Sequence, residues 1–282
     1  MSFDPTQAAG LHLPRRRPLP SIDRLGGVVR ELARRDTALT IFGLTLLASM
    51  IPPLLAMGFD DRLLRGVNIW VKPLKFMASV GLYALTLAWF IGHVDAAWRR
   101  ARPIRVAVWT TIVAGGFEVG YVTLMAGLGS ASHFNTGTPL TAAMYALMGA
   151  GALALTAASP LLAWQIVRHG DPALDPAYRA SVVLGLALTF VLGAGVGSVL
   201  AQLQPPTGPA LPVLGWSTVA GDLRPAHFFG IHAQQLLPLA GAAVAALLPR
   251  RGVGWVSALA AGYAAFTLAV FAQAMAGRPF IG

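Results

Sequence analysis

The sequence has no cysteine and very little charge. Among its 282 residues the absence of cysteine excludes disulfides, iron–sulfur clusters, thiolate zinc sites and covalently attached c-type haem. Charged residues make up 11% of the chain, against about 25% in a soluble globular domain. Hydrophobic residues make up 56%. So few charges cannot cover a water-facing surface, and the composition therefore predicts a protein whose solvent is lipid.

Long apolar stretches provide the positive evidence for a membrane protein. A hydrocarbon core about 30 Å thick needs roughly 20 helical residues, and a spanning segment without helical hydrogen bonds would have to close into a barrel. None of the long stretches shows the alternation of period two that is typical of barrel strands. The sequence predicts an all-α polytopic bundle of seven transmembrane helices at 37–58, 77–94, 104–127, 139–167, 180–203, 226–248 and 252–276.

The distribution of basic residues predicts how this bundle is oriented. Of the 21 Lys and Arg residues, 15 fall in the N-terminal segment and the loops on its side of the membrane, and 6 fall on the other side. The positive-inside rule therefore predicts a cytoplasmic N-terminus and a periplasmic C-terminus. We expect a multi-pass protein of the bacterial inner membrane.

The segment 1–36 is predicted to be a basic tail ahead of the transmembrane domain 37–282. No apolar run follows its first arginines, so it does not read as a signal peptide. Residues 21–36 can form an amphipathic helix with an arginine-rich face, which favours contact with an anionic inner leaflet. Nucleic-acid binding is the alternative use of these arginines, and we expect the lipid bilayer rather than nucleic acid as the partner.

Polar residues gather near the predicted outer ends of the spans. Most lie in the segments 68–76, 132–135 and 221–235. Glu118 lies inside the third span, slightly outward of its middle. An ionisable group within a span costs at least about 2.5 kcal/mol, so Glu118 needs a partner, a proton or a water-filled cavity. The inner half of the bundle is nearly apolar, and the sequence therefore predicts one polar site that opens to the periplasm.

Each candidate residue has a chemical role and a plainer alternative. The lysines could instead reach the outer headgroups, Asp222 and Arg224 could form a local ion pair, His133 could be an ordinary loop histidine, and Glu118 could pair across helices. The predicted roles are catalytic groups at Glu118, His232 and Asp222, ligand-binding groups at Lys72, Lys75, Arg224, Asn135, Gln235 and Tyr121, and metal ligands at His133, His227, His232 and Glu118.

Helical geometry limits how two of these histidines can cooperate. His227 and His232 are five residues apart, which turns the helix by roughly 500° and leaves them about 140° apart around the axis. A regular helix therefore cannot easily offer both to one ion, although a π-bulge near Gly230 would change this. The run from Gly193 to Gly197 matches a nucleotide-binding fingerprint only in its letters, because it lies within a span, and it predicts close helix packing.

Two main functions fit this predicted site. The first is a zinc or iron ion, or non-covalent haem b, held by histidine and carboxylate for hydrolytic or redox chemistry on an anionic or lipidic substrate. The second is a transporter or sensor of a small anionic or lipidic ligand, with Glu118 as a proton switch. A purely structural membrane subunit is a third interpretation. The sequence predicts no particular oligomeric state.

Three strings carry a resemblance to other sequences. They are Asn-x-Trp-x-Lys-Pro-x-Lys-Phe at 68–76, Ser-His-Phe-Asn at 132–135 and Gly-Asp-Leu-Arg at 221–224. They resemble those of an uncharacterised group of bacterial seven-helix membrane proteins, and the likeness spans most of the bundle. This resemblance implies the fold and no activity. The stretch 252–276 contains neither the HxxxH motif of the ceramidase-like membrane hydrolases nor the Schiff-base lysine of rhodopsins.

Overall fold

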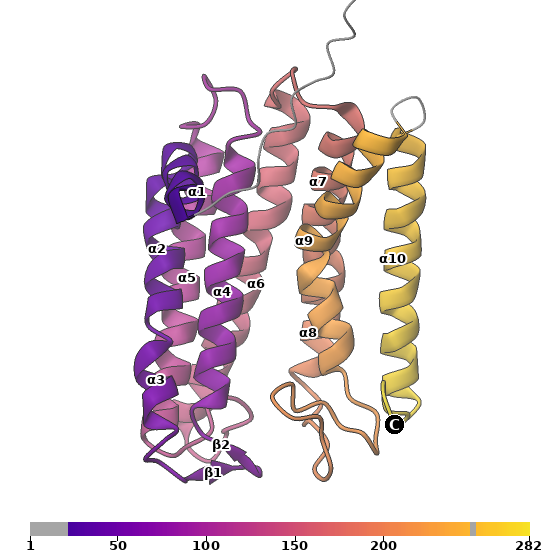
Figure 1. Cartoon of the computed structure of the whole chain (residues 1–282). Helices are drawn as coiled ribbons and strands as arrows, with labels where there is room; N and C mark the ends of the chain where they lie inside the picture. Colours follow the sequence, from indigo (N-terminus) through magenta and orange to yellow (C-terminus); the bar gives the residue numbers. More distant parts are fainter. Residues whose placement is uncertain (1–21, 249–251) are drawn as a thin grey trace, which may run out of the picture.

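The computed structural model describes residues 22–248 and 252–282, and these are almost all helical (Figure 1). The only paired strands in this part of the chain form one short antiparallel hairpin. The elements are α1 Ile22–Arg35, α2 Thr37–Ala48, α3 Ile51–Ala56, β1 Leu63–Leu64, β2 Val67–Asn68, α4 Val71–Ile91, α5 Arg102–Gly127, α6 Pro139–His169, α7 Pro176–Leu188, the π-helix η1 Thr189–Ala194, α8 Gly195–Leu200, α9 Arg224–Leu247 and α10 Gly252–Met275.

Seven helical segments are long and apolar enough to cross a membrane, which confirms the predicted number of spans and is consistent with a multi-pass membrane protein. The largest difference in boundary is in the second span, which begins at Val71 rather than at 77. Lys72 and Lys75 interrupt the apolar run in the sequence, but Pro73 is tolerated in the first turn of a helix. Both lysines therefore project from the first two turns of α4.

Two spans contain irregular backbone. The first breaks between α2 and α3, where Pro52 and Pro53 occupy the first positions of α3. The fifth passes through the π-helix η1 between α7 and α8. The sixth does not contain the bulge considered near Gly230, because α9 is α-helical from Arg224 to Leu247. The π-helix lies opposite that glycine instead, and a Cβ added to Gly230 would come within 2.8 Å of the Gly193 backbone nitrogen.

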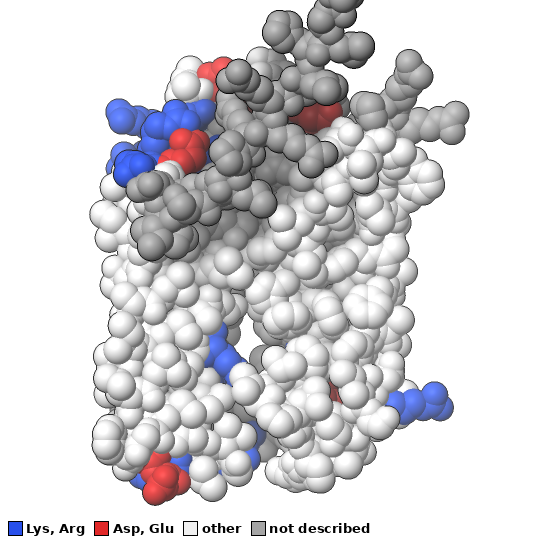
Figure 2. Space-filling model, viewed as in Figure 1, with Lys and Arg blue, Asp and Glu red and all other residues white. Residues whose placement is uncertain are grey.

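The spans form two groups (Figure 1). The first group consists of α2 to α6, with α1 packed on α2 and α4, and the second consists of α7, η1, α8, α9 and α10. α6 joins the groups by packing against α7 and η1, whereas α9 packs on α7, α10 and η1 and hardly on α4. Figure 2 shows the molecule hollowed between the groups, with basic side chains on the wall of this hollow.

The two ends of the bundle differ. α1 lies at one end, here called the α1 end, and the β-hairpin and the C-terminus lie at the other, the hairpin end (Figure 1). The predicted helix 21–36 is seen as α1, which Leu32 and Arg35 fix to the bundle. Leu32 is buried, and Arg35 donates to the Trp89 carbonyl and lies 3.8 Å from the centre of its ring. The predicted tail 1–20 lies outside the described residues, and the contact of α1 with lipid stays a prediction.

Candidate functional site

The predicted site residues form three separate sets rather than one. Lys72 lies near enough to Glu118 and His133 in the first group to interact with both electrostatically. Lys75 meets the loop that precedes α9, next to Arg224 and Asp222. His232 and Gln235 of α9 reach Thr86 of α4.

Glu118 is the centre of the first set. It lies on α5, is 2% exposed, and points at α6, where a Cβ added to Gly151 would lie 2.8 Å from its Oε1. That Oε1 has no hydrogen-bond partner among the described residues. Lys72 of α4 is near enough to interact electrostatically with Glu118, although the two form no ion pair at bonding distance. Gly151 thus provides the space for a carboxyl group that a larger residue would exclude.

His133 completes this set from the loop between α5 and α6. Its ring lies between those of Phe76 and Tyr145, with centroids 5.8 and 5.7 Å away. Its Nδ1 is 3.1 Å from the Ser132 hydroxyl. Burial, aided by the positive charge of Lys72, lowers the pKa of His133 to about 3. The imidazole is therefore neutral near pH 7 and can accept a hydrogen bond there, but it resists protonation.

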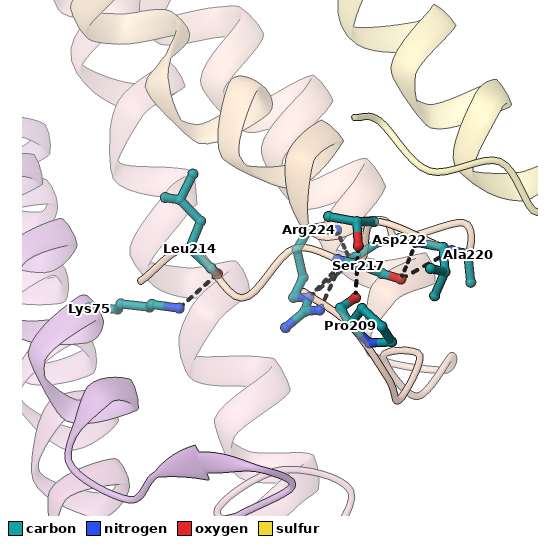
Figure 3. A network of polar contacts seen from close by, with 9 residues as sticks. Lys75, Pro209, Leu214, Ser217, Ala220, Asp222 and Arg224 are labelled. Carbon is teal, nitrogen blue, oxygen red and sulfur yellow. Dashed lines mark hydrogen bonds and ion pairs between the residues drawn. The ribbon is translucent and has the colours of Figure 1, made fainter. Parts of the chain in front are cut away.

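The second set joins the two helix groups (Figure 3). Lys75 points away from α4, and its ammonium donates to the Leu214 carbonyl at 2.8 Å. Arg224 approaches the same loop from the start of α9. A Cβ added to Gly215 would lie 3.6 Å from a nitrogen of each cation, so both reach one point of the loop. Gly215 has φ 70°, a conformation that glycine adopts without strain.

Asp222 balances one of these two cations. It lies 2.6 Å from the Arg224 guanidinium and also accepts from the Ser217 backbone at 2.9 Å. Burial opposes ionisation, but these hydrogen bonds from Arg224 and Ser217 hold the pKa of Asp222 below its usual value. The local ion pair considered from the sequence is thus confirmed. No carboxylate of the described residues lies within ion-pair distance of Lys75, so the set keeps a net positive charge.

The loop that accepts the hydrogen bond from Lys75 is strained at the residue before Leu214. Val213 has φ 64°, which is unfavourable for a β-branched residue. The Leu214 backbone donates to the Pro212 carbonyl at 2.6 Å, which closes a three-residue γ-turn. Such strain is worth of order 1–3 kcal/mol and is often found in loops that take part in function.

The third set extends along α9. His232 lies 3.2 Å from the Gln235 side-chain oxygen, and the Gln235 amide donates to the Thr86 hydroxyl at 3.1 Å. His227 points elsewhere, with its Nδ1 3.1 Å from the Gly193 carbonyl of η1. The prediction that a regular helix separates the two histidines is therefore confirmed. Close packing of the glycine run is also confirmed at Gly193, whose added Cβ would lie 2.9 Å from Ile231.

The described residues contain no group of three or more His, Cys, Asp or Glu side chains that could hold a metal ion. The predicted ligands are divided between the first set, with Glu118 and His133, and the third, with His232; His227 faces the π-helix. The donor set expected from the sequence is therefore not assembled within the part of the chain that the structure describes.

Other predicted residues have local structural partners. Asn135 donates to Ser130 and Ala131 of its own loop, and Tyr121 stacks on Phe117, one turn away on the same helix. Asn68 and Trp70 of the first string both bind Asp60. These residues make contacts within their own segments. None of them is hydrogen bonded to Lys75 or Arg224 in the described part of the chain.

Sequence reasoning missed three participants in or near the sets. Leu214 contributes a backbone carbonyl, which no side-chain pattern can reveal. Thr86 lies in an apolar span, where a lone threonine is common. Gln234 is fully buried, with neither side-chain polar atom bonded among the described residues. An amide in the middle of an apolar span is the one signal that could have been used.

Comparison with models of protein families, with curated proteins and with solved structures finds no match for this chain.

Proposed function

We propose that this protein is a bacterial inner-membrane carrier or sensor that binds a small anionic or lipid-like ligand. The main support for this proposal is the second set, where Lys75 and Arg224 come from different helix groups and reach the same loop residue. One carboxylate, Asp222, faces two cations there, and Lys75 has only a carbonyl as acceptor. An anion between the two cations would gain charge-assisted hydrogen bonds from both.

The distribution of charge supports a site on the outer side. Basic residues are concentrated at the α1 end (Figure 2), and by the positive-inside rule that end is cytoplasmic. The hairpin end with Lys75 and Arg224 would then face the periplasm. In this proposal Glu118 is a separate buried group near Lys72, and a proton on Glu118 would report occupancy or a change in packing.

The metal or haem alternative has no comparable support. A zinc or non-haem iron site needs several converging donors, and the described residues contain no such group. Histidine could serve haem b as an axial ligand, but no feature of the geometry favours it over the anion. We therefore base the experiment on anion binding.

The test uses the full chain in detergent with inorganic phosphate and dodecyl phosphate as probes, against sodium chloride of equal ionic strength. Ligand that binds only the folded state raises the thermal unfolding midpoint. We expect both probes to raise it for the wild type and far less for Lys75→Gln. Arg62→Gln is the matched control, because Arg62 lies at the same end but is already paired with Asp60 at 2.7 Å.

Equal shifts in Lys75→Gln and wild type, or no shift with either probe, would overturn the proposal. Loss of the shift in Lys75→Gln together with its retention in Arg62→Gln would support it.

A further inference from the structure

α4 and α9 form the two walls of a cleft. Both helices run from the hairpin end toward the α1 end (Figure 1), and they hardly pack on one another. Lys75 and Arg224 meet at Gly215, and Thr86 meets Gln235 through a hydrogen bond of 3.1 Å. Each second residue is eleven positions beyond the first in its own helix, a rise of about 16 Å. The helices are therefore joined at two levels and open between them.

The walls between these two levels are mainly apolar, although Ser79 of α4 and His232 of α9 also lie there. Leu82 of α4 lies seven residues after Lys75, almost on the same face, and is 43% exposed. Phe228 of α9 lies one turn after Arg224 and is 37% exposed, with its ring 4.4 Å from that of His232. Figure 2 shows the hollow in this part of the molecule, between the two groups. The cleft thus has two cations at one end and mainly apolar side chains along its length.

Two cations beside an apolar wall favour an anion that also has a hydrocarbon part. A free inorganic anion could use only the cationic end. A membrane lipid with an anionic headgroup could use both parts, because its acyl chain would cover Leu82 and Phe228 while its headgroup met the cations. Lysines and arginines near a membrane surface attract such headgroups. The cations also lie at the ends of spans, where headgroups are found, since Lys75 is in the second turn of α4 and Arg224 is the first residue of α9.

We propose that the α4–α9 cleft binds one lipid with an anionic headgroup, its head between Lys75 and Arg224 and an acyl chain along Leu82 and Phe228. This inference rests on the proposed function and names its ligand class. The headgroup takes the place of the Leu214 carbonyl on Lys75. The strained turn at Val213 favours that exchange, because release of the carbonyl lets the turn relax.

The experiment places the full chain in phosphatidylcholine nanodiscs that contain a small fraction of phosphatidylglycerol with a diazirine in one acyl chain. After illumination, mass spectrometry locates the adducts. Phosphatidylcholine with the same diazirine is the control lipid. We expect adducts on Leu82 and Phe228 to be up to about thirtyfold more abundant with the anionic lipid, the factor that two cations near one headgroup can supply. Adducts on Ile41 and Val113, exposed on α2 and α5, should not distinguish the lipids.

Two variants separate the headgroup from the chain. Lys75→Gln should reduce the preference for the anionic lipid toward unity, whereas Arg62→Gln should retain it. Leu82→Trp fills the cleft and should remove adducts on Phe228, yet it should leave the thermal shift with inorganic phosphate intact. That last result would show that the fold and the cationic end survive in the variant.

The outcomes distinguish this inference from the proposed function. Equal labelling of the cleft by both lipids, or labelling that Lys75→Gln leaves unchanged, overturns the lipid assignment. If phosphate still raises the unfolding midpoint in a Lys75-dependent way, the anion site stands and only the lipid is wrong. If that shift is absent as well, the proposed function falls with it.

Discussion

The two helix groups are held together by different means. The first group has one large core of interlocked side chains, among which Leu39, Leu87 and Leu162 are almost completely buried. The second group has three small apolar clusters and depends more on close approach at glycine, although the first group has one such contact, between Gly43 and Gly81. Gly230 lies against Gly193, and a Cβ on Gly241 would overlap Ser181. A side-chain core can adjust to change, but backbone contact leaves almost no space for it.

This difference explains where the candidate ligand cleft occurs. Inside a bilayer, helices associate through van der Waals packing and hydrogen bonds rather than through the hydrophobic effect. Each group makes most of its packing contacts within itself, and the two groups meet mainly through α6, α7 and η1. α4 and α9 are left to face each other across polar contacts at their ends. The gap between the groups therefore coincides with Lys75, which has no carboxylate partner among the described residues, and with Arg224.

The largest expected effect comes from Gly230→Leu in the second group. The new side chain must enter the space of the Gly193 backbone, which cannot move aside as a side chain would. We expect a loss of at least about 3 kcal/mol in the free energy of unfolding, measured by thermal or denaturant unfolding in detergent. Gly262→Leu on α10 is the control, because no atom lies within 4 Å of its added Cβ. Equal losses in both variants would contradict glycine-mediated packing.

Acid should weaken the first group through His93, which lies between α4 and α5 at the α1 end. Burial, aided by the nearby Arg35, lowers the pKa of His93 to about 4. The unfolded chain binds this proton near pH 6.5 and the folded chain only near 4, so stability is full above about pH 6.5 and falls as the pH drops. The expected loss by pH 4 is roughly 3 kcal/mol. His93→Phe should flatten the pH dependence of the unfolding midpoint; an unchanged slope would contradict this assignment.

Two adjacent glutamines should respond in opposite ways. Gln235→Leu removes the bond to Thr86 that joins the groups and the bond to His232 within α9, and should cost about 1 kcal/mol. Gln234→Leu replaces a buried amide whose polar atoms have no partner among the described residues, and should be neutral or stabilising by about 1 kcal/mol. The unfolding midpoints of the two variants check this. Destabilisation by Gln234→Leu would mean that its amide has a partner in the membrane.

The smallest effect is expected from Val213→Gly in the loop over Lys75. Glycine adopts the positive φ of this position without strain, so the contact of Leu214 with Lys75 becomes more favourable. Stability should rise by less than about 1 kcal/mol, because glycine also gains freedom in the unfolded chain. Phosphate should bind a few times more weakly, since it competes with a more stable loop. Val219→Gly, at an exposed position of the same loop with an ordinary φ, should lower stability by up to about 1 kcal/mol and leave phosphate binding unchanged.

The sequence was sufficient for the helices but not for the composition of the site. Spans appear as apolar runs because each must be about as long as the bilayer is thick. The separation of His227 from His232 followed from helical pitch alone, and the structure agrees. The π-helix η1 could not be predicted from the local sequence. Its backbone at Gly193 lies against Gly230 of another span, and this contact exists only in the folded chain.

Composition and hydropathy by themselves determined that this chain is built from seven helices suited to a membrane, since backbone polar groups in lipid must be bonded within each segment. Only the tertiary structure decided which polar residues meet. Lys72 and Lys75 are three residues apart, and their directions differ by only about 60° around α4. That turn sends Lys72 toward Glu118 and His133 inside the first group, and Lys75 across to the loop of the second. A sequence gives the depth of each residue in the membrane, but the direction in which it points has meaning only once its neighbours are placed.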